Sequence, residues 1–182
     1  MNIRTLMMGV AAAALWGTAA NAQEVLKLGH VGAPGSLYES TGNNFAACVD
    51  ASGKATVEVY GSSQLGNDEE KLQKLKLGQI AFSIPSSIMS SVSPTFGIFE
   101  MPYLIKDRDH MRKVRDEMGS TFVDAASDKG YRIIGFWENG FRNVTNNVRP
   151  VTVPADLEGI KLRTPKGEWR GKMFQSYGAH PT

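Results

Sequence analysis

Arginine is the side chain in this sequence best suited to recognise an anion, and two arginines lie where predicted strands meet polar turns. Arg142 and Arg163 fall in the segment 137–165, WENGFRNVTNNVRPVTVPADLEGIKLRTP. A planar guanidinium presents parallel N–H donors that match the two oxygens of a carboxylate, which a lysine cannot do. The segment therefore predicts an anion-binding site. Spacing alone also fits a surface arginine at 163 and, at 142, an arginine paired with Glu138 or Asp156.

Further polar side chains follow predicted strands. In an open α/β sheet, ligands bind outside the carboxyl ends of the strands. His30 follows the first predicted strand, and Ser86 and Ser87 follow the third. After the fifth come Glu138 and Asn139. We expect these residues to line the same site as the arginines.

Trp169 is a weaker candidate for the site. It opens a short helical pattern after Arg163 and could face the ligand. An indole in this place could equally cover the core of a second domain.

The sequence does not indicate an enzyme. Its three histidines, His30, His110 and His180, are far apart and have no H-x-x-x-H or cysteine partner, so we expect no metal site. No G-x-S-x-G elbow occurs, and the glycines of residues 29–35 do not have the G-x-G-x-x-G spacing of a dinucleotide loop. We therefore predict no catalytic residue and no cofactor.

Hydrophobic periodicity predicts the elements that position these residues. Ser36 and Glu39 form a capping box before a helical pattern, and Asn67 caps a second one with an acidic first turn. Strands alternate with helices along the chain, which indicates an α/β fold with a largely parallel sheet. The predicted strands span 25–31, 55–61, 80–84, 98–104, 131–137 and 160–163, and the two later helices span 107–128 and 169–177.

Charge and cysteine content narrow the class of protein. The formal net charge is only +2 and the basic residues are dispersed, so we expect neither nucleic acid nor a membrane surface as partner. Cys48 is the single cysteine, which excludes an internal disulfide. Between Phe45 and Val49 on a predicted helix, its thiol is expected to be buried and inert.

The N-terminus is typical of a secretory signal peptide. Arg4 is followed by the apolar run LMMGVAAAALWG and then by Ala20-Asn21-Ala22, an A-x-A cleavage site. The run is shorter than the roughly 20 residues of a membrane-spanning helix. We expect residues 1–22 to be removed on export, with cleavage near Ala22. The alternative is an uncleaved anchoring helix.

Motifs along the chain resemble those of one family. The segments FRNVTNN-x-RP, DLEGIKLRTP and YGAHPT occur in order near the C-terminus. Earlier segments agree: QLG at 64–66, LGQI at 77–80 and MPYL at 101–104. Over residues 24–182 the sequence resembles the extracytoplasmic solute-binding proteins of tripartite ATP-independent periplasmic (TRAP) transporters, typified by C4-dicarboxylate receptors.

This resemblance implies a fold and a domain organisation. Members of the family close two α/β domains like a clamshell around a carboxylate, and they are longer than this chain. We therefore expect residues 23–138 to form the first lobe. Residues 139–182 would form the crossing and the start of a second lobe that is incomplete here.

The resemblance also implies a function. Arg163 would form a two-point salt bridge with the ligand's carboxylate, and Arg142 would be a second contact. The protein would be a periplasmic, non-enzymatic monomer that delivers a small organic acid to TRAP membrane permease subunits driven by an ion gradient. The ligand could be a C4-dicarboxylate, a 2-oxo or hydroxy acid, or a uronate.

Two other functions remain open from the sequence. The same clamshell could present its bound acid to a membrane sensor kinase. An exported hydrolase or lyase would require catalytic groups from outside these residues.

Overall fold

A computed structural model describes residues 23–182. The predicted signal peptide and its cleavage site, residues 1–22, lie outside the described residues. Within residues 23–182, no helix combines the length and apolar character needed to cross a membrane.

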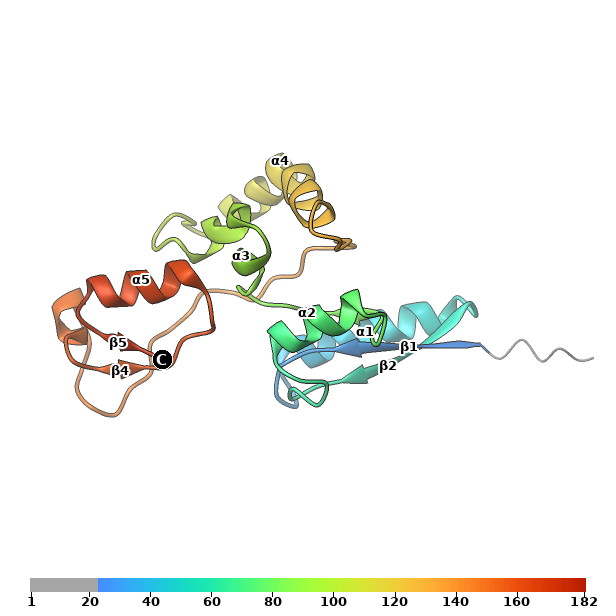
Figure 1. The fold of residues 1–182 in the computed structure, drawn as a ribbon, viewed down its shortest axis with the longest axis horizontal. Helices are drawn as coiled ribbons and strands as arrows, with labels where there is room; N and C mark the ends of the chain where they lie inside the picture. The colour runs from blue at the N-terminus through green and yellow to red at the C-terminus, as the bar shows by residue number, and fades with distance from the viewer. Residues whose placement is uncertain (1–22) are drawn as a thin grey trace, which may run out of the picture.

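A parallel sheet organises the N-terminal part (Figure 1). Its central strand β1 (Glu24–Gly29) pairs along its whole length with β2 (Ala55–Tyr60) and at its carboxyl end with β3 (Phe82–Ser83). The crossovers are made by α1 (Leu37–Ala51) and α2 (Asp68–Lys76). All three strands end at the same edge of the sheet, which confirms the predicted parallel α/β fold and shortens the third strand.

Side-chain caps start both crossover helices as predicted. The Ser36 hydroxyl accepts a hydrogen bond from the Glu39 backbone N at 3.4 Å, while the Glu39 carboxylate accepts from the backbone N of Gly35. At α2 the capping box is reciprocal: Asn67 Oδ1 accepts from Glu70 N at 3.0 Å, and the Glu70 carboxylate accepts from Asn67 N at 2.9 Å. These bonds satisfy backbone donors that a helix start would otherwise leave unpaired.

The core of this sheet corrects the expectation for Cys48, whose side chain is exposed. Helix α1 buries Gly42 and Ala46 against the sheet, whose core holds Leu28 and Val57. Position 48 lies about 200° around the helix from position 46, because each residue turns the helix by about 100°. Phe45 and Val49 are half-buried on the flanks of the buried face, and Cys48 points away from it.

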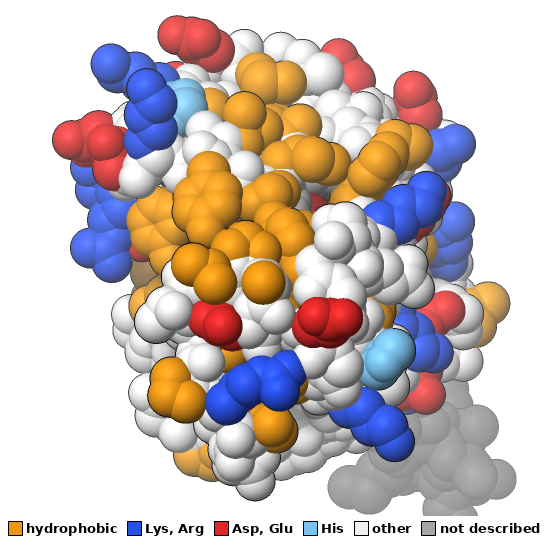
Figure 2. All heavy atoms as spheres, turned by 90° about the vertical axis from the view of Figure 1, so that its left-hand side faces the viewer, with side chains coloured by type: hydrophobic (Ala, Val, Ile, Leu, Met, Phe, Trp, Pro, Cys, Tyr) orange, Lys and Arg blue, Asp and Glu red, His pale blue; other side chains and the backbone are white. Residues whose placement is uncertain are grey.

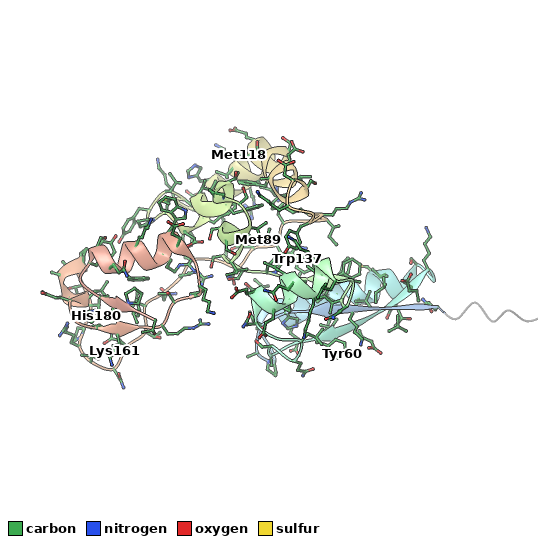
Figure 3. All side chains as sticks on the ribbon, viewed as in Figure 1. Tyr60, Met89, Met118, Trp137, Lys161 and His180 are labelled. Atoms are coloured by element: carbon green, nitrogen blue, oxygen red, sulfur yellow. The ribbon has the colours of Figure 1, made fainter. Side chains whose placement is uncertain are left out.

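A second core forms around the long helix α4 (Arg108–Ser127), where Phe122 and Ala126 are fully buried. The chain reaches it through the short helix α3 (Met89–Val92) and the 3-10 helix η2 (Pro94–Glu100). Met89 and Met118 mark this group of helices in Figure 3.

The predicted strand at 98–104 is wrong. Ser93 caps η2 and Pro94 occupies its first turn, where a fixed φ and a missing N–H suit a helix start. Phe96 and Phe99 are three residues apart, the repeat of a 3-10 helix, and both rings contact Phe122.

The predicted strand at 131–137 is also wrong. The segment is not helical, but it pairs with no strand among the described residues, so no ladder forms. Its side chains pack instead: Phe136 lies 6.1 Å from Phe122, and Trp137 lies 6.0 Å from Phe45 on α1, ring centroid to centroid. Figure 3 shows Trp137 beside the helices of the first sheet.

The C-terminal unit has its own small parallel sheet. It contains η3 (Pro154–Leu157), β4 (Lys161–Leu162), α5 (Glu168–Ser176) and β5 (His180–Pro181), with Lys161 opposite His180 in the register. The predicted strand at 160–163 and the predicted helix at 169–177 are confirmed, and each of their ends differs by one residue from the prediction. Its core contains Leu157, Ile160 and Ala179, all buried.

Apolar side chains gather on the face of the molecule that carries this C-terminal unit (Figure 2). Trp169 on α5 is more than one-third exposed, as are Met101, Tyr103 and Leu104 after η2. Contiguous apolar surface generally marks a contact face rather than a surface that stays in water.

We predict that Phe122→Ala lowers the free energy of unfolding by about 3–5 kcal/mol, because it leaves a cavity where three aromatic rings converge. Urea denaturation measures the change. Leu77→Ala is the matched control: Leu77 is 70% exposed, and the change should stay within about 0.5 kcal/mol. Equal effects of the two substitutions would contradict the assignment of the second core.

Candidate ligand-binding site

Two arginines converge on a pair of serine hydroxyls at the carboxyl edge of the first sheet. Ser86 and Ser87 follow β3, and their Oγ atoms lie 3.4 Å apart. Arg142 Nη2 donates to Ser86 Oγ at 3.2 Å and to Ser87 Oγ at 3.3 Å. Arg170 Nη1 donates to Ser87 Oγ at 2.6 Å. The site thus joins the end of β3, the connection after α4 and the first turn of α5.

An ion pair between the fully buried Lys71 and the partly buried Asp68 holds the serines in place. The backbone N of Ser86 donates to Asp68 Oδ2 at 3.4 Å, and Asp68 Oδ1 lies 3.0 Å from Lys71 Nζ. Lys71 is fully buried, and its ammonium also donates to the carbonyl of Gly66 at 3.1 Å. Because the two charges compensate each other, this anchor adds no net charge beside the arginines.

Arg170 is a residue of the candidate site that the sequence did not predict. It is only 5% exposed, and its backbone N donates to Glu100 Oε2 at 3.1 Å. Burial lowers the pKa of its guanidinium, the nearby charge of Arg142 lowers it further, and Glu100 raises it. The sequence held one signal: a cation in the first turn of a helix opposes the helix dipole, and such a placement calls for a compensating reason.

Glu100 is the buried carboxylate beneath this site. It is 5% exposed and also accepts a hydrogen bond from the hydroxyl of Ser90. A Cβ at Gly167 would lie 2.7 Å from Glu100 Oε2, so the absence of a side chain there lets the start of α5 close over the carboxylate. A lone glutamate in the apolar run IFEMPYL was the signal available in the sequence.

Tyr38 borders the serines from α1. Burial raises the pKa of its phenol, and a hydrogen bond with the Ser86 side chain acts in the opposite direction. The charges of Asp68 and Arg142 also act on this pKa, the first raising and the second lowering it. Tyr38 was not among the residues that the sequence predicted for the site.

His30 is packed inside the first lobe. It is fully buried, its Nδ1 accepts from the backbone N of Gly32 at 3.2 Å, and its ring stacks on Tyr38 with centroids 6.2 Å apart. Desolvation is the largest cause of its lowered pKa, Lys71 acts in the same direction, and Glu39 opposes them. The imidazole is therefore neutral at pH 7, and it supports the loop beside Tyr38.

The remaining predicted residues do not join the serine cluster. Glu138 Oε1 lies 2.5 Å from Arg108 Nε, and Asn139 is exposed. Trp169 packs against Gly97, and the ammonium of Lys172 lies 5.3 Å from its ring centroid. Arg142 therefore pairs with neither of the carboxylates that its alternative interpretation required, since Asp156 accepts hydrogen bonds from Thr152 and Val153.

Arg163 directly follows β4 and is exposed. The ion pairs and hydrogen bonds of the described residues include no partner for its side chain. Its guanidinium is thus available at the carboxyl end of the second parallel sheet, the position that the sheet rule gives to a ligand.

A separate open hollow of about 560 Å³ lies between the start of α4 and the chain near Phe141. Its arginines are already paired, Arg108 with Glu138 and Arg112 with Asp109, so it presents no convergent set of free donors. Across residues 23–182, no three His, Cys, Asp or Glu side chains gather as a metal site would require. The hollow near Phe141 is lined by Lys106, Asp107, Arg108, Asp109, Arg112, Gly140 and Phe141.

We predict that His30 causes the free energy of unfolding to decrease as the pH is lowered. Its folded-state pKa lies below the ordinary 6.5, so below about pH 6.5 the unfolded state binds more protons and folding loses free energy. Urea denaturation between about pH 7.5 and about pH 5.5 should show a smaller loss for His30→Gln than for the wild type. His110 and His180 are present in both proteins and cancel. Parallel pH profiles would contradict the neutral, buried imidazole.

Comparison with known proteins shows which family and which relatives this chain is similar to. The profile of the family described as bacterial extracellular solute-binding protein, family 7, matches residues 28–182. The C4-dicarboxylate-binding periplasmic protein of Rhodobacter capsulatus is 32% identical over 164 residues, which are 86% of this chain and 48% of that protein. The chain spans about half the length of the curated relatives it matches.

Solved structures agree with this match. A TRAP periplasmic solute-binding protein of Sulfurospirillum deleyianum with bound succinate is 32% identical, with a TM-score of 0.80 over 88% of this chain and 53% of that one. A sugar acid binding protein of Advenella mimigardefordensis in complex with galactonate is 29% identical, with a TM-score of 0.83 over 87% and 53%. The expected α/β fold with parallel strands is thereby confirmed. The chain belongs to the extracellular solute-binding proteins of family 7, the receptors of TRAP transporters.

Proposed function

We propose that this protein captures a small organic acid by its carboxylate and does not transform it. The observation that carries the proposal is the convergence of Arg142 and Arg170 on two serine hydroxyls with no carboxylate in ion-pair contact within the described part of the chain. Relatives that bind C4-dicarboxylate, succinate and galactonate support an organic acid as the ligand.

Arg163 is the proposed carboxylate clamp. Its exposed guanidinium at the end of β4 can make two parallel hydrogen bonds to one carboxylate. Arg142 is the proposed second contact, with Ser86 and Ser87 as hydroxyl donors. His30 is proposed to support the loop behind them, while Glu138, Asn139 and Trp169, whose side chains form no hydrogen bond with the serines within residues 23–182, are secondary candidates.

The proposed role is transport from the periplasm. Export would place the receptor outside the cytoplasmic membrane, and it would hand its bound acid to TRAP permease subunits driven by an ion gradient. Membership of family 7 supports both steps. A soluble receptor of this kind acts as a monomer, with residues 23–138 as one lobe and the crossing after Glu138 leading to the other.

We predict that the full-length protein is stabilised by an organic acid from a panel that includes succinate, D-galactonate and D-glucuronate. An acid present at 100 times its Kd should raise the free energy of unfolding by about 2.7 kcal/mol. Thermal shift at fixed ionic strength measures this rise, with the amide of each acid as the control. A panel in which no acid shifts the melting temperature would contradict the proposed function.

Arg163→Ala should weaken binding of the acid found in that panel at least about tenfold, because losing a charge-assisted pair removes about 1.5–3 kcal/mol. Calorimetry on the full-length protein measures the Kd. The matched control is Arg115→Ala, since Arg115 is a surface arginine on α4 paired with Asp116. Unchanged affinity in Arg163→Ala would remove Arg163 from the site.

A further inference from the structure

The guanidinium of Arg170 is buried without a carboxylate partner. Other arginines, such as Arg108, Arg112 and Arg115, are exposed and each forms an ion pair. A buried charge is normally paired, because removing it from water is costly. Arg170 is 5% exposed, yet the ion pairs of residues 23–182 do not include it.

Glu100 does not fill this gap by direct contact. One of its oxygens accepts from the backbone N of Arg170 at 3.1 Å, and the other accepts from the Ser90 hydroxyl. The negative charge of Glu100 thus reduces the free-energy cost of burying the guanidinium, although the carboxylate oxygens accept their hydrogen bonds from other groups. The guanidinium itself donates a hydrogen bond to Ser87 Oγ at 2.6 Å.

A second cation shares that partner. Arg142 Nη2 donates to the same Ser87 Oγ at 3.3 Å, so two guanidinium groups meet at one neutral hydroxyl. Their repulsion contributes to the lowered pKa of Arg170. Two cations and the single anion of Glu100 leave an excess of one positive charge, which one carboxylate would neutralise.

The hydrogen-bonding capacity of the group points the same way. Each guanidinium has five N–H donors and no acceptor, and only part of this capacity is used here. The Oγ atoms of Ser86 and Ser87 accept from the arginines, and one of the two hydroxyls donates to the other, which leaves one hydroxyl proton for a further acceptor. A set of donors favours a group that only accepts, such as a carboxylate, over a sugar hydroxyl.

We propose that Arg170 is a ligand-contacting residue and that, with Arg142 and Ser87, it forms a two-arginine subsite for a carboxylate of the bound acid. The inference rests on the proposed function and deepens it. Arg170 lies on α5, whereas Arg163 lies on a different element, directly after β4. Under this proposal Arg163 is not the only residue that selects for an acidic ligand, because Arg170 also binds a carboxylate.

The test is calorimetry of the full-length protein with succinate, D-galactonate and D-glucuronate. Arg170→Gln, which replaces the charged guanidinium with a neutral amide on a shorter side chain, should weaken binding of the acid at least about tenfold. Arg170→Lys should restore only part of the affinity, because an ammonium lacks the planar fork. The wild type should also lose affinity more steeply with salt than Arg170→Gln does, a change that a merely structural role would not produce. Arg115→Gln is the matched surface control.

The outcomes separate the two proposals. If Arg163→Ala weakens binding and a folded Arg170→Gln does not, the subsite is overturned and the proposed function stands. If the wild type binds none of the three acids, the result contradicts both the proposed function and the subsite for these ligands. If Arg170→Gln does not fold, Ser87→Ala carries the test, because it removes only the shared hydroxyl. Unchanged affinity and salt dependence in Ser87→Ala would then overturn the subsite.

Discussion

The parallel pairing of β1 with both β2 and β3 is the constraint on which the site depends. Parallel strands end at the same edge of a sheet, so the loops after the three strands must meet there. The ladder also continues into those loops: His30 N donates to the Tyr60 carbonyl at 3.0 Å, and Ile84 N donates to the Gly29 carbonyl at 3.1 Å. The serines that follow Ile84 are therefore carried on backbone already fixed by the sheet.

Buried polar side chains make the floor of the site rigid, and small residues make room for them. A Cβ at Gly29 would lie 2.7 Å from Lys71 Cδ, and a Cβ at Gly61 would lie 2.8 Å from His30 Cε1. Lys71 and His30 are both fully buried, so neither site could accept a larger residue without displacing its neighbour. The glycines at these strand ends therefore serve the packing of the polar floor as well as the turns.

The sequence predicted the elements that are determined by residues close together in the chain. The predictions failed where the structure depends on contacts with residues far away in the sequence. Helix starts at Ser36 and Asn67 were predictable because the capping groups are three residues apart. The segment 131–137 was misassigned because its apolar pattern could not show that, within residues 23–182, no strand pairs with it. Of the candidate site, Ser86 and Ser87 were predicted because polar residues after a strand follow a topological rule, while Arg142 was predicted although the strand expected before it does not form. Arg170 was not, because burial of a helical arginine is a tertiary property.

The choice of serine at the meeting point of the two arginines has a physical reason. A carboxylate in place of Ser87 would hold both guanidinium groups as well, but it would neutralise them and remove the attraction for an anionic ligand. A hydroxyl accepts their hydrogen bonds without cancelling their charge. Glu100, placed one step behind, makes the buried Arg170 tolerable while leaving its charge directed at the serines. The like charges of Arg142 and Arg170 repel each other across Ser87, and an anion held between them would relieve that repulsion.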